Sequence, residues 1–127
     1  MLTYTEAFSG FSVDDVAQAK EFYEQRLGLK VTEDGAGFLQ LHIGDGTFVF
    51  VYPKDDHQPA EYTVLNFRVD DVDGAVGALT EAGVTFEDYE ETDERGVMRG
   101  RAAGMGPDIA WFRDPAGNVL SVLQMDE

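Results

Sequence analysis

A short internal repeat constrains the fold of this chain more than any other feature of its sequence. The residues FSVDDV at positions 11–16 recur as FRVDDV at positions 67–72. In each copy apolar side chains alternate with a polar one, which predicts a β-strand, and the aspartate pair that follows suits the N-cap of a helix. Apolar residues at helical spacing come next, and both helices are expected to end at a glycine, Gly28 and Gly83. The chain therefore contains one strand–helix unit twice.

Further strands are predicted after each helix. Their expected ranges are Leu29–Thr32, Gly37–Ile43, Thr47–Tyr52, Val84–Tyr89, Ile109–Phe112 and Val119–Leu123. The last two flank the sequence DPAGN at 114–118, where proline and glycine favour a tight hairpin turn.

This order favours an α+β fold of two tandem βαβββ modules that form a curled mixed sheet around a cleft. The modules are expected at about residues 1–56 and 57–127 of a single domain. A ferredoxin-like βαββαβ fold fits less well, because it has a single hairpin between its helices. The interval between the two predicted helices is long enough for more strands than that.

Composition excludes several classes of protein. A net charge of −16 would repel the phosphates of nucleic acid and an anionic membrane surface, so neither partner is expected. The absence of cysteine excludes disulfides, cysteine-based zinc sites and a thiol nucleophile, and two histidines limit any metal site to two imidazoles. The sequence has no apolar run of membrane-spanning length and no secretory segment, so a cytoplasmic location is expected.

The acidity has two interpretations. It could steer a cationic ligand towards the protein by long-range attraction. It could instead keep a solvated surface soluble, for example in a cytoplasm of high salt concentration. The second interpretation is favoured, because runs of charge usually face water and because only Lys20, Lys30 and Lys54 oppose 25 acidic residues.

Three stretches resemble the vicinal oxygen chelate superfamily, which contains glyoxalase I, extradiol dioxygenases and the bleomycin-resistance binding proteins. They are the aspartate-paired start of each helix, the residues EFYEQRLGL at 21–29, and WFRDPAGN at 111–118. The resemblance covers essentially the whole chain and implies the paired βαβββ fold. It does not by itself imply an activity.

The resemblance also implies where a metal would bind, and the residues at those positions do not suit one. Metal-using members place a histidine at the start of the first strand of each module, where this chain has Phe8 and Val64. They place glutamates on the fourth strands, where this chain has Ser121 and, at 48–52, a strand without a carboxylate. Phenylalanine and valine offer no lone pairs, so we expect no metal and no cofactor.

Strand alternation and the resemblance together suggest a cleft lined mainly by aromatic and apolar side chains. Such a lining suits a flat organic ligand, oriented by Asn66 or Ser121. The alternative is that these aromatic residues fill a core. The predicted lining residues are Phe8, Phe48, Phe50, Tyr52, Val64, Asn66, Trp111 and Ser121.

Several polar residues are further candidates. His57 with Glu61 could form a polar site, although a loop histidine beside acids is more often a surface residue. His42 could reach the cleft, but a solvent-facing position is favoured. Arg99 and Arg101 lie with Arg95 in a glycine-rich segment between strands. They could hold a carboxylate or phosphate as part of a lid. The favoured alternative is that they neutralise the nearby acids Glu90, Glu91, Asp93 and Glu94.

Three functions follow. The first is a metal-free small-molecule-binding protein of the glyoxalase/bleomycin-resistance type, which sequesters an aromatic or cationic compound. The second is a glyoxalase-like lyase, isomerase or dioxygenase with a non-standard site drawn from His57, Glu61, His42 and Ser121. The third is a subunit or regulatory partner. A homodimer is expected, because small members of this family often pair.

Overall fold

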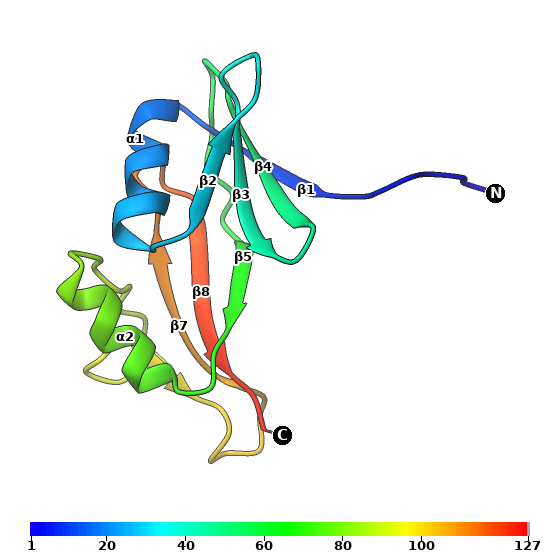
Figure 1. Ribbon diagram of the computed structural model, residues 1–127. Helices are drawn as coiled ribbons and strands as arrows, with labels where there is room; N and C mark the ends of the chain where they lie inside the picture. Colours follow the sequence, from blue (N-terminus) through cyan, green and yellow to red (C-terminus); the bar gives the residue numbers. More distant parts are fainter. Residues whose placement is uncertain (127) are drawn as a thin grey trace. The chain divides into compact units, whose positions relative to one another are not determined.

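The first strand–helix repeat forms a four-stranded mixed sheet with its helix. The computed structural model describes residues 1–126, and the chain divides into two compact units, Met1–Gln58 and Pro59–Glu127 (Figure 1). In unit 1 the strand order is β1-β4-β3-β2, with β1 parallel to β4 and the other pairs antiparallel. Its elements are β1 (Ser9–Val13), α1 (Val16–Glu21), the π-helix η1 (Phe22–Arg26), β2 (Lys30–Glu33), β3 (Leu39–Gly44) and β4 (Thr47–Pro53).

The second repeat forms the same topology in unit 2. Its strand order is β5-β8-β7-β6, with β5 parallel to β8 and the other pairs antiparallel. Figure 1 shows α2 beside β7, and the helix contacts both β7 and β8. The α+β class and the tandem βαβββ modules predicted from the sequence are therefore confirmed, with a separate sheet in each module. The elements are β5 (Thr63–Arg68), α2 (Val72–Glu81), β6 (Val97–Arg99), β7 (Asp108–Arg113) and β8 (Val119–Gln124).

The repeated aspartates and glycines begin and end the helices as predicted. The side chain of Asp15 accepts a hydrogen bond from the backbone N–H of Gln18 at 3.0 Å, and Asp71 accepts one from Gly74 at 3.1 Å. Each carboxylate thereby satisfies one N–H that the helix leaves unpaired. Gly28 and Gly83 have positive φ angles of 72° and 96°. None of the described helices has the length and hydropathy needed to cross a membrane.

Each sheet has one face that carries the core. In unit 1 the fully buried side chains Val13, Leu39, Leu41 and Val51 alternate along their strands with half-buried ones, and Tyr23 is buried with them. In unit 2 the buried set includes Val72, Val97, Phe112 and Leu120. The opposite face of the first sheet stays partly open, and it carries the side chains described in the next section.

The predicted strand Val84–Tyr89 is wrong, and the true edge strand lies later in the chain. Phe86 makes a single bridge to Phe112, and the N–H of Glu87 donates to the carbonyl of Trp111 at 2.8 Å. Val97 then pairs with Ala110, so the pairing along the edge of β7 passes from residue 87 directly to residue 97. The segment 88–96 forms a loop outside the sheet. That segment is polar and lacks apolar alternation, so it cannot bury one face in a sheet.

One turn type recurs at three places within residues 1–126. The DPAGN turn at 114–118 is confirmed: an oxygen of Asp114 accepts the N–H groups two and four residues later. Asp34 and Asp93 make the same pair of bonds. The fourth residue of each turn is a glycine with a positive φ of 82° to 87°, which a side chain would strain. These glycines are Gly37, Gly96 and Gly117.

Candidate functional site

A cluster of aromatic rings covers the open face of the sheet in unit 1. On β4, Val49 and Val51 point into the core, so Phe48, Phe50 and Tyr52 lie on the other face, where all three are half-buried. The ring centroids of Phe50 and Tyr52 are 5.7 Å apart, in a stacked arrangement.

Two more rings join this cluster. Phe8, just before β1, stacks on Phe48 with centroids 4.7 Å apart. Phe38, just before β3, meets Phe50 edge-on at 5.6 Å. We call the five side chains the aromatic face: Phe8, Phe38, Phe48, Phe50 and Tyr52.

The structure thus brings together four of the predicted lining residues and adds Phe38. The sequence held a signal for Phe38, since it precedes the alternating strand that begins at Leu39. Counting back by two from His42 and Gln40 places Phe38 on the same face.

A polar group lies along one side of the aromatic face. On β3, Gln40 is opposite Phe50 and His42 is opposite Phe48. The Thr32 hydroxyl on β2 contacts both polar side chains, with 3.3 Å to Gln40 Oε1 and 2.9 Å to His42 Nε2. His42 is therefore half-buried in a hydrogen-bonded group on the open face of the sheet.

A second histidine lies on the β1 side of the same sheet. Ser12 is opposite Tyr52, and its Oγ lies 2.6 Å from His57 Nδ1. The predicted partner of His57, Glu61, is an exposed residue of the other unit. The structure describes a contact of His57 with Ser12, and a polar site of His57 with Glu61 stays a prediction.

The predicted residues of unit 2 lie mainly on one face of its own sheet. Ser121 is fully buried and donates a hydrogen bond to Asn66 Oδ1. Trp111 is opposite Ser121, and its indole N–H donates to Thr63 Oγ1 at 3.1 Å. Val64 is half-buried where the pairing of β5 with β8 shifts register.

The residues at the family's metal positions do not fit a metal ion. Phe8 is held in an aromatic stack, Val64 is an aliphatic side chain, and the hydroxyl of Ser121 is engaged by Asn66. Within residues 1–126, no three histidine or carboxylate side chains gather closely enough to hold a metal ion. The donor chemistry at these positions therefore supports no metal-dependent step.

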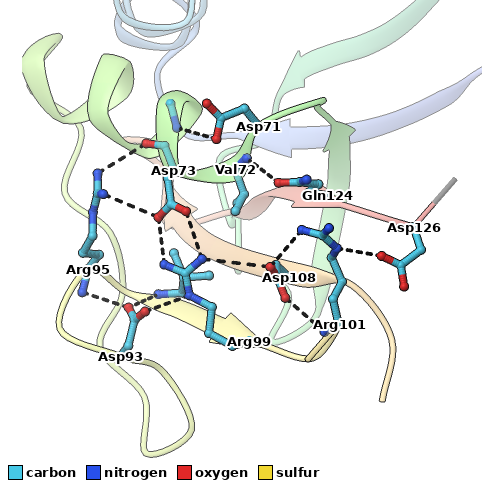
Figure 2. A network of polar contacts seen from close by, with 12 residues as sticks. Asp71, Val72, Asp73, Asp93, Arg95, Arg99, Arg101, Asp108, Gln124 and Asp126 are labelled. Atoms are coloured by element: carbon cyan, nitrogen blue, oxygen red, sulfur yellow. Dashed lines mark hydrogen bonds and ion pairs between the residues drawn. The ribbon is translucent and has the colours of Figure 1, made fainter. Parts of the chain in front are cut away.

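The arginines of the glycine-rich segment form an ion-pair network with aspartates (Figure 2). Arg99 makes a two-point contact with Asp73 on α2, at 2.7 and 3.0 Å, and its Nε donates to Asp93 at 3.0 Å. Arg101 donates to Asp108 at 3.3 Å and to Asp126 at 2.8 Å.

These contacts change the protonation equilibria of the network. The hydrogen bond from Arg99 lowers the pKa of Asp73 below its ordinary value of 3.8, against a smaller effect of burial in the other direction. Hydrogen bonds to Asp73 and Asp93 raise the pKa of Arg99. Both partners therefore stay charged at neutral pH.

The expectation that these arginines neutralise acidic residues agrees with this geometry, but the partners differ. Of the four acids named from the sequence, the described contacts include Asp93; the other partners are Asp73, Asp108 and Asp126, of which Asp73 and Asp126 are distant in sequence from the arginines they meet. Sequence spacing could not identify them, because topology brings them together. The same segment borders an apolar depression of about 450 Å³ lined by Val97, Met98, Ala103 and Met105 among others.

Solved structures share this fold. TnmS3, an antibiotic binding protein from Streptomyces sp. CB03234, is 26% identical, with a TM-score of 0.68, and the match covers 98% of this chain and 100% of that chain. A member of the glyoxalase/bleomycin resistance protein/dioxygenase superfamily from Sphaerobacter thermophilus is 25% identical, with a TM-score of 0.67 and coverage of 94% and 98%. The fosfomycin resistance protein FosX from Listeria monocytogenes has a TM-score of 0.69 at 13% identity, covering 98% and 96%, and shows likeness of fold.

The sequence gives the family directly. No curated protein sequence matches the chain. The model of the glyoxalase/bleomycin resistance protein/dioxygenase superfamily matches residues 6–122, nearly the whole chain. The paired βαβββ modules agree with that match, and the chain therefore belongs to this superfamily.

Proposed function

We propose that this protein binds a flat organic molecule without a metal ion, and that the aromatic face of unit 1 is the surface that binds it. The observation that carries the proposal is the set of five rings on the side of the sheet away from its core. Rings that only filled a core would be buried, whereas Phe8 is 53% exposed and the other four are half-buried. Partly exposed, mutually stacked rings offer a planar ligand a large contact area.

The likeness to an antibiotic binding protein supports a ligand of this kind. TnmS3 is described as binding an antibiotic, and it covers nearly the whole of this chain at 26% identity. A protein that sequesters such a compound needs a binding surface and no catalytic group. The net charge of −16 would also attract a cationic compound over long range.

The polar face of unit 2 is a second proposed set of ligand contacts. Asn66, Trp111 and Ser121 combine an indole ring with hydrogen-bonding groups, and Val64 lies near them on β5. Arg99 and Arg101 are weaker candidates, because carboxylates of the chain itself occupy their guanidinium groups. Asn66→Ala should weaken the affinity for a ligand that needs these groups.

A thermal-shift screen of flat aromatic compounds, including cationic ones, tests the proposed function. A ligand that binds the native state should raise the melting temperature. Phe50→Ala should then reduce both the shift and the affinity measured by calorimetry, because Phe50 lies at the centre of the ring contacts. Tyr62→Ala is the matched control, since Tyr62 is an exposed aromatic residue outside the aromatic face. Equal affinities of the two variants would contradict the proposal.

A second candidate is an enzyme with a relocated site, and the Ser12–His57 contact of 2.6 Å favours it. A hydroxyl beside an imidazole is the arrangement in which a base activates a nucleophile. Mass spectrometry after incubation with p-nitrophenyl acetate would show an acetyl group on Ser12 if this pair acts in that way. No added acetyl mass on Ser12, the result also expected for the Ser12→Ala variant, would contradict it.

Homodimer formation and a cytoplasmic location are further predictions from the sequence. Light scattering of the purified chain measures the first. Fractionation of cells that produce the protein measures the second.

A further inference from the structure

We infer that Gln40 and His42 recognise an adjacent hydrogen-bond donor and acceptor on the ligand of the aromatic face, as in a lactam or amide fused to an aromatic ring. This inference rests on the proposed function, because it concerns the chemical class of molecule that the same face binds. It is carried by a hydrogen-bond chain through Thr32 that determines which atoms can donate and which can accept.

The chain runs from His42 through Thr32 to Gln40. The Thr32 hydroxyl has one hydrogen, and it donates that hydrogen to Gln40 Oε1 at 3.3 Å. With that hydrogen on Gln40, we assign the contact of 2.9 Å between Thr32 Oγ1 and His42 Nε2 as a bond that the histidine donates. A neutral imidazole with its hydrogen on Nε2 has a lone pair on Nδ1. This assignment makes His42 Nδ1 an acceptor.

The same chain sets the role of Gln40. Its carbonyl oxygen accepts the bond from Thr32, so its NH₂ group is the part of the amide that can donate to a ligand. Both polar ends contact one hydroxyl oxygen, which keeps them close to each other. The group thus offers one donor, the Gln40 amide, and one acceptor, His42 Nδ1, on side chains that share Thr32 as a partner.

The position of this group relates it to the stacked rings. Gln40 is opposite Phe50 and His42 is opposite Phe48 in the pairing of β3 with β4. Directly opposed residues on one face of a sheet have Cβ atoms about 4.5–5.5 Å apart. A planar molecule that contacts the rings of Phe48 and Phe50 would therefore lie beside Gln40 and His42.

The ligand edge that complements such a pair carries an N–H next to a C=O. The N–H would donate to His42 Nδ1, and the C=O would accept from the Gln40 amide. A planar molecule without these groups would leave half-buried polar atoms unpaired, which costs affinity. The two side chains therefore select among flat ligands that stack equally well.

Calorimetry with three probes tests this inference. 2-Quinolinone carries the adjacent N–H and C=O, N-methyl-2-quinolinone lacks the donor, and 4-methyl-2-quinolinone has an extra methyl group but keeps the donor. The wild-type protein should bind both N–H probes about three- to tenfold more tightly than the N-methyl probe, the range expected for one hydrogen bond. In His42→Phe, which keeps a ring without an acceptor, this ratio should fall to about one.

The controls separate this inference from the proposed function. Gln40→Leu should weaken all three probes, because each keeps the carbonyl group. Equal wild-type affinity for all three, lowered to the same extent by Phe50→Ala, would overturn the role of His42 and leave the proposed function standing. Unchanged affinities in Gln40→Leu would overturn the role of Gln40 in the same way. Probe binding that Phe50→Ala does not change would overturn the proposed function itself.

Discussion

A Cβ atom added at Gly10 would lie 3.1 Å from the carbonyl oxygen of Phe50, its partner in the parallel pairing of β1 with β4. The same atom would lie 3.4 Å from the Cβ of Phe50. Since Gly10 and Phe50 share one face of the sheet, the missing side chain leaves room for the ring at the centre of the aromatic face.

Gly10→Ala should therefore lower the free energy of unfolding by about 1 kcal/mol, because the nearest obstacle is a backbone carbonyl that cannot move freely. Gly35→Ala is the control, since a Cβ there would meet nothing within 4 Å. Urea unfolding of both variants measures the difference. Equal free energies of unfolding for Gly10→Ala and Gly35→Ala would contradict this prediction, because β1 and β4 would then adjust to the added Cβ without loss of stability.

The repeated turn predicts unequal effects of one substitution at two sites. Asp114 is buried, with 4% exposure, and it accepts bonds from the backbone of Ala116 and from both the backbone and side-chain amides of Asn118. Asp114→Ala should cost about 2–3 kcal/mol, because buried donors are left unpaired. Asp34→Ala, in an exposed copy of the turn, should cost about 1 kcal/mol or less, because water replaces the carboxylate. Chemical denaturation measures both, and equal losses would contradict the role assigned to burial.

The ion pair of Arg99 with Asp73 predicts a pH-dependent stability. Because the pair lowers the pKa of Asp73 in the folded protein, its contribution is present above the ordinary value of 3.8 and is lost as the pH falls through the lowered value. The side chains are 37% and 41% exposed, so Arg99→Gln should cost only about 0.5–1 kcal/mol at pH 7.

The difference between wild type and Arg99→Gln should shrink below about pH 4 and with added salt. Arg26→Gln is the control, since Arg26 contacts Glu21 at 3.7 Å on an exposed surface. Thermal unfolding across this pH range measures the effect. A difference between wild type and Arg99→Gln that stays constant from pH 7 to pH 2 would contradict the assignment.

The fold could be predicted from the sequence because the local signals for helix ends agree with the repeated topology. The two aspartate caps, Gly28 and Gly83 each act within a few residues, and the repeat shows that the same unit occurs twice. The prediction failed at Val84–Tyr89, where the apolar alternation stops after Phe86 and the edge strand resumes at Val97. A strand interrupted by a polar excursion has no local signature, because its two parts are joined only through their common partner β7.

The candidate site was predictable where one strand carries it and unpredictable where topology assembles it. Alternation along β4 placed Phe48, Phe50 and Tyr52 on one face. The pairing of His42 with Thr32 depends on the register between β2 and β3, and the Ser12–His57 contact depends on a loop that follows β4. Register and loop path are fixed by packing, so neither contact can be read from spacing in the sequence.

The most direct test of the account is an NMR titration of the protein, labelled at its phenylalanine rings, with a planar compound that raises its melting temperature. We predict that the largest ring-proton shifts occur at Phe8, Phe48 and Phe50, and that Phe112 in the core of unit 2 stays unchanged. Unchanged ring-proton shifts at Phe8, Phe48 and Phe50, with changes confined to phenylalanines of unit 2, would contradict the claim that the aromatic face binds the ligand.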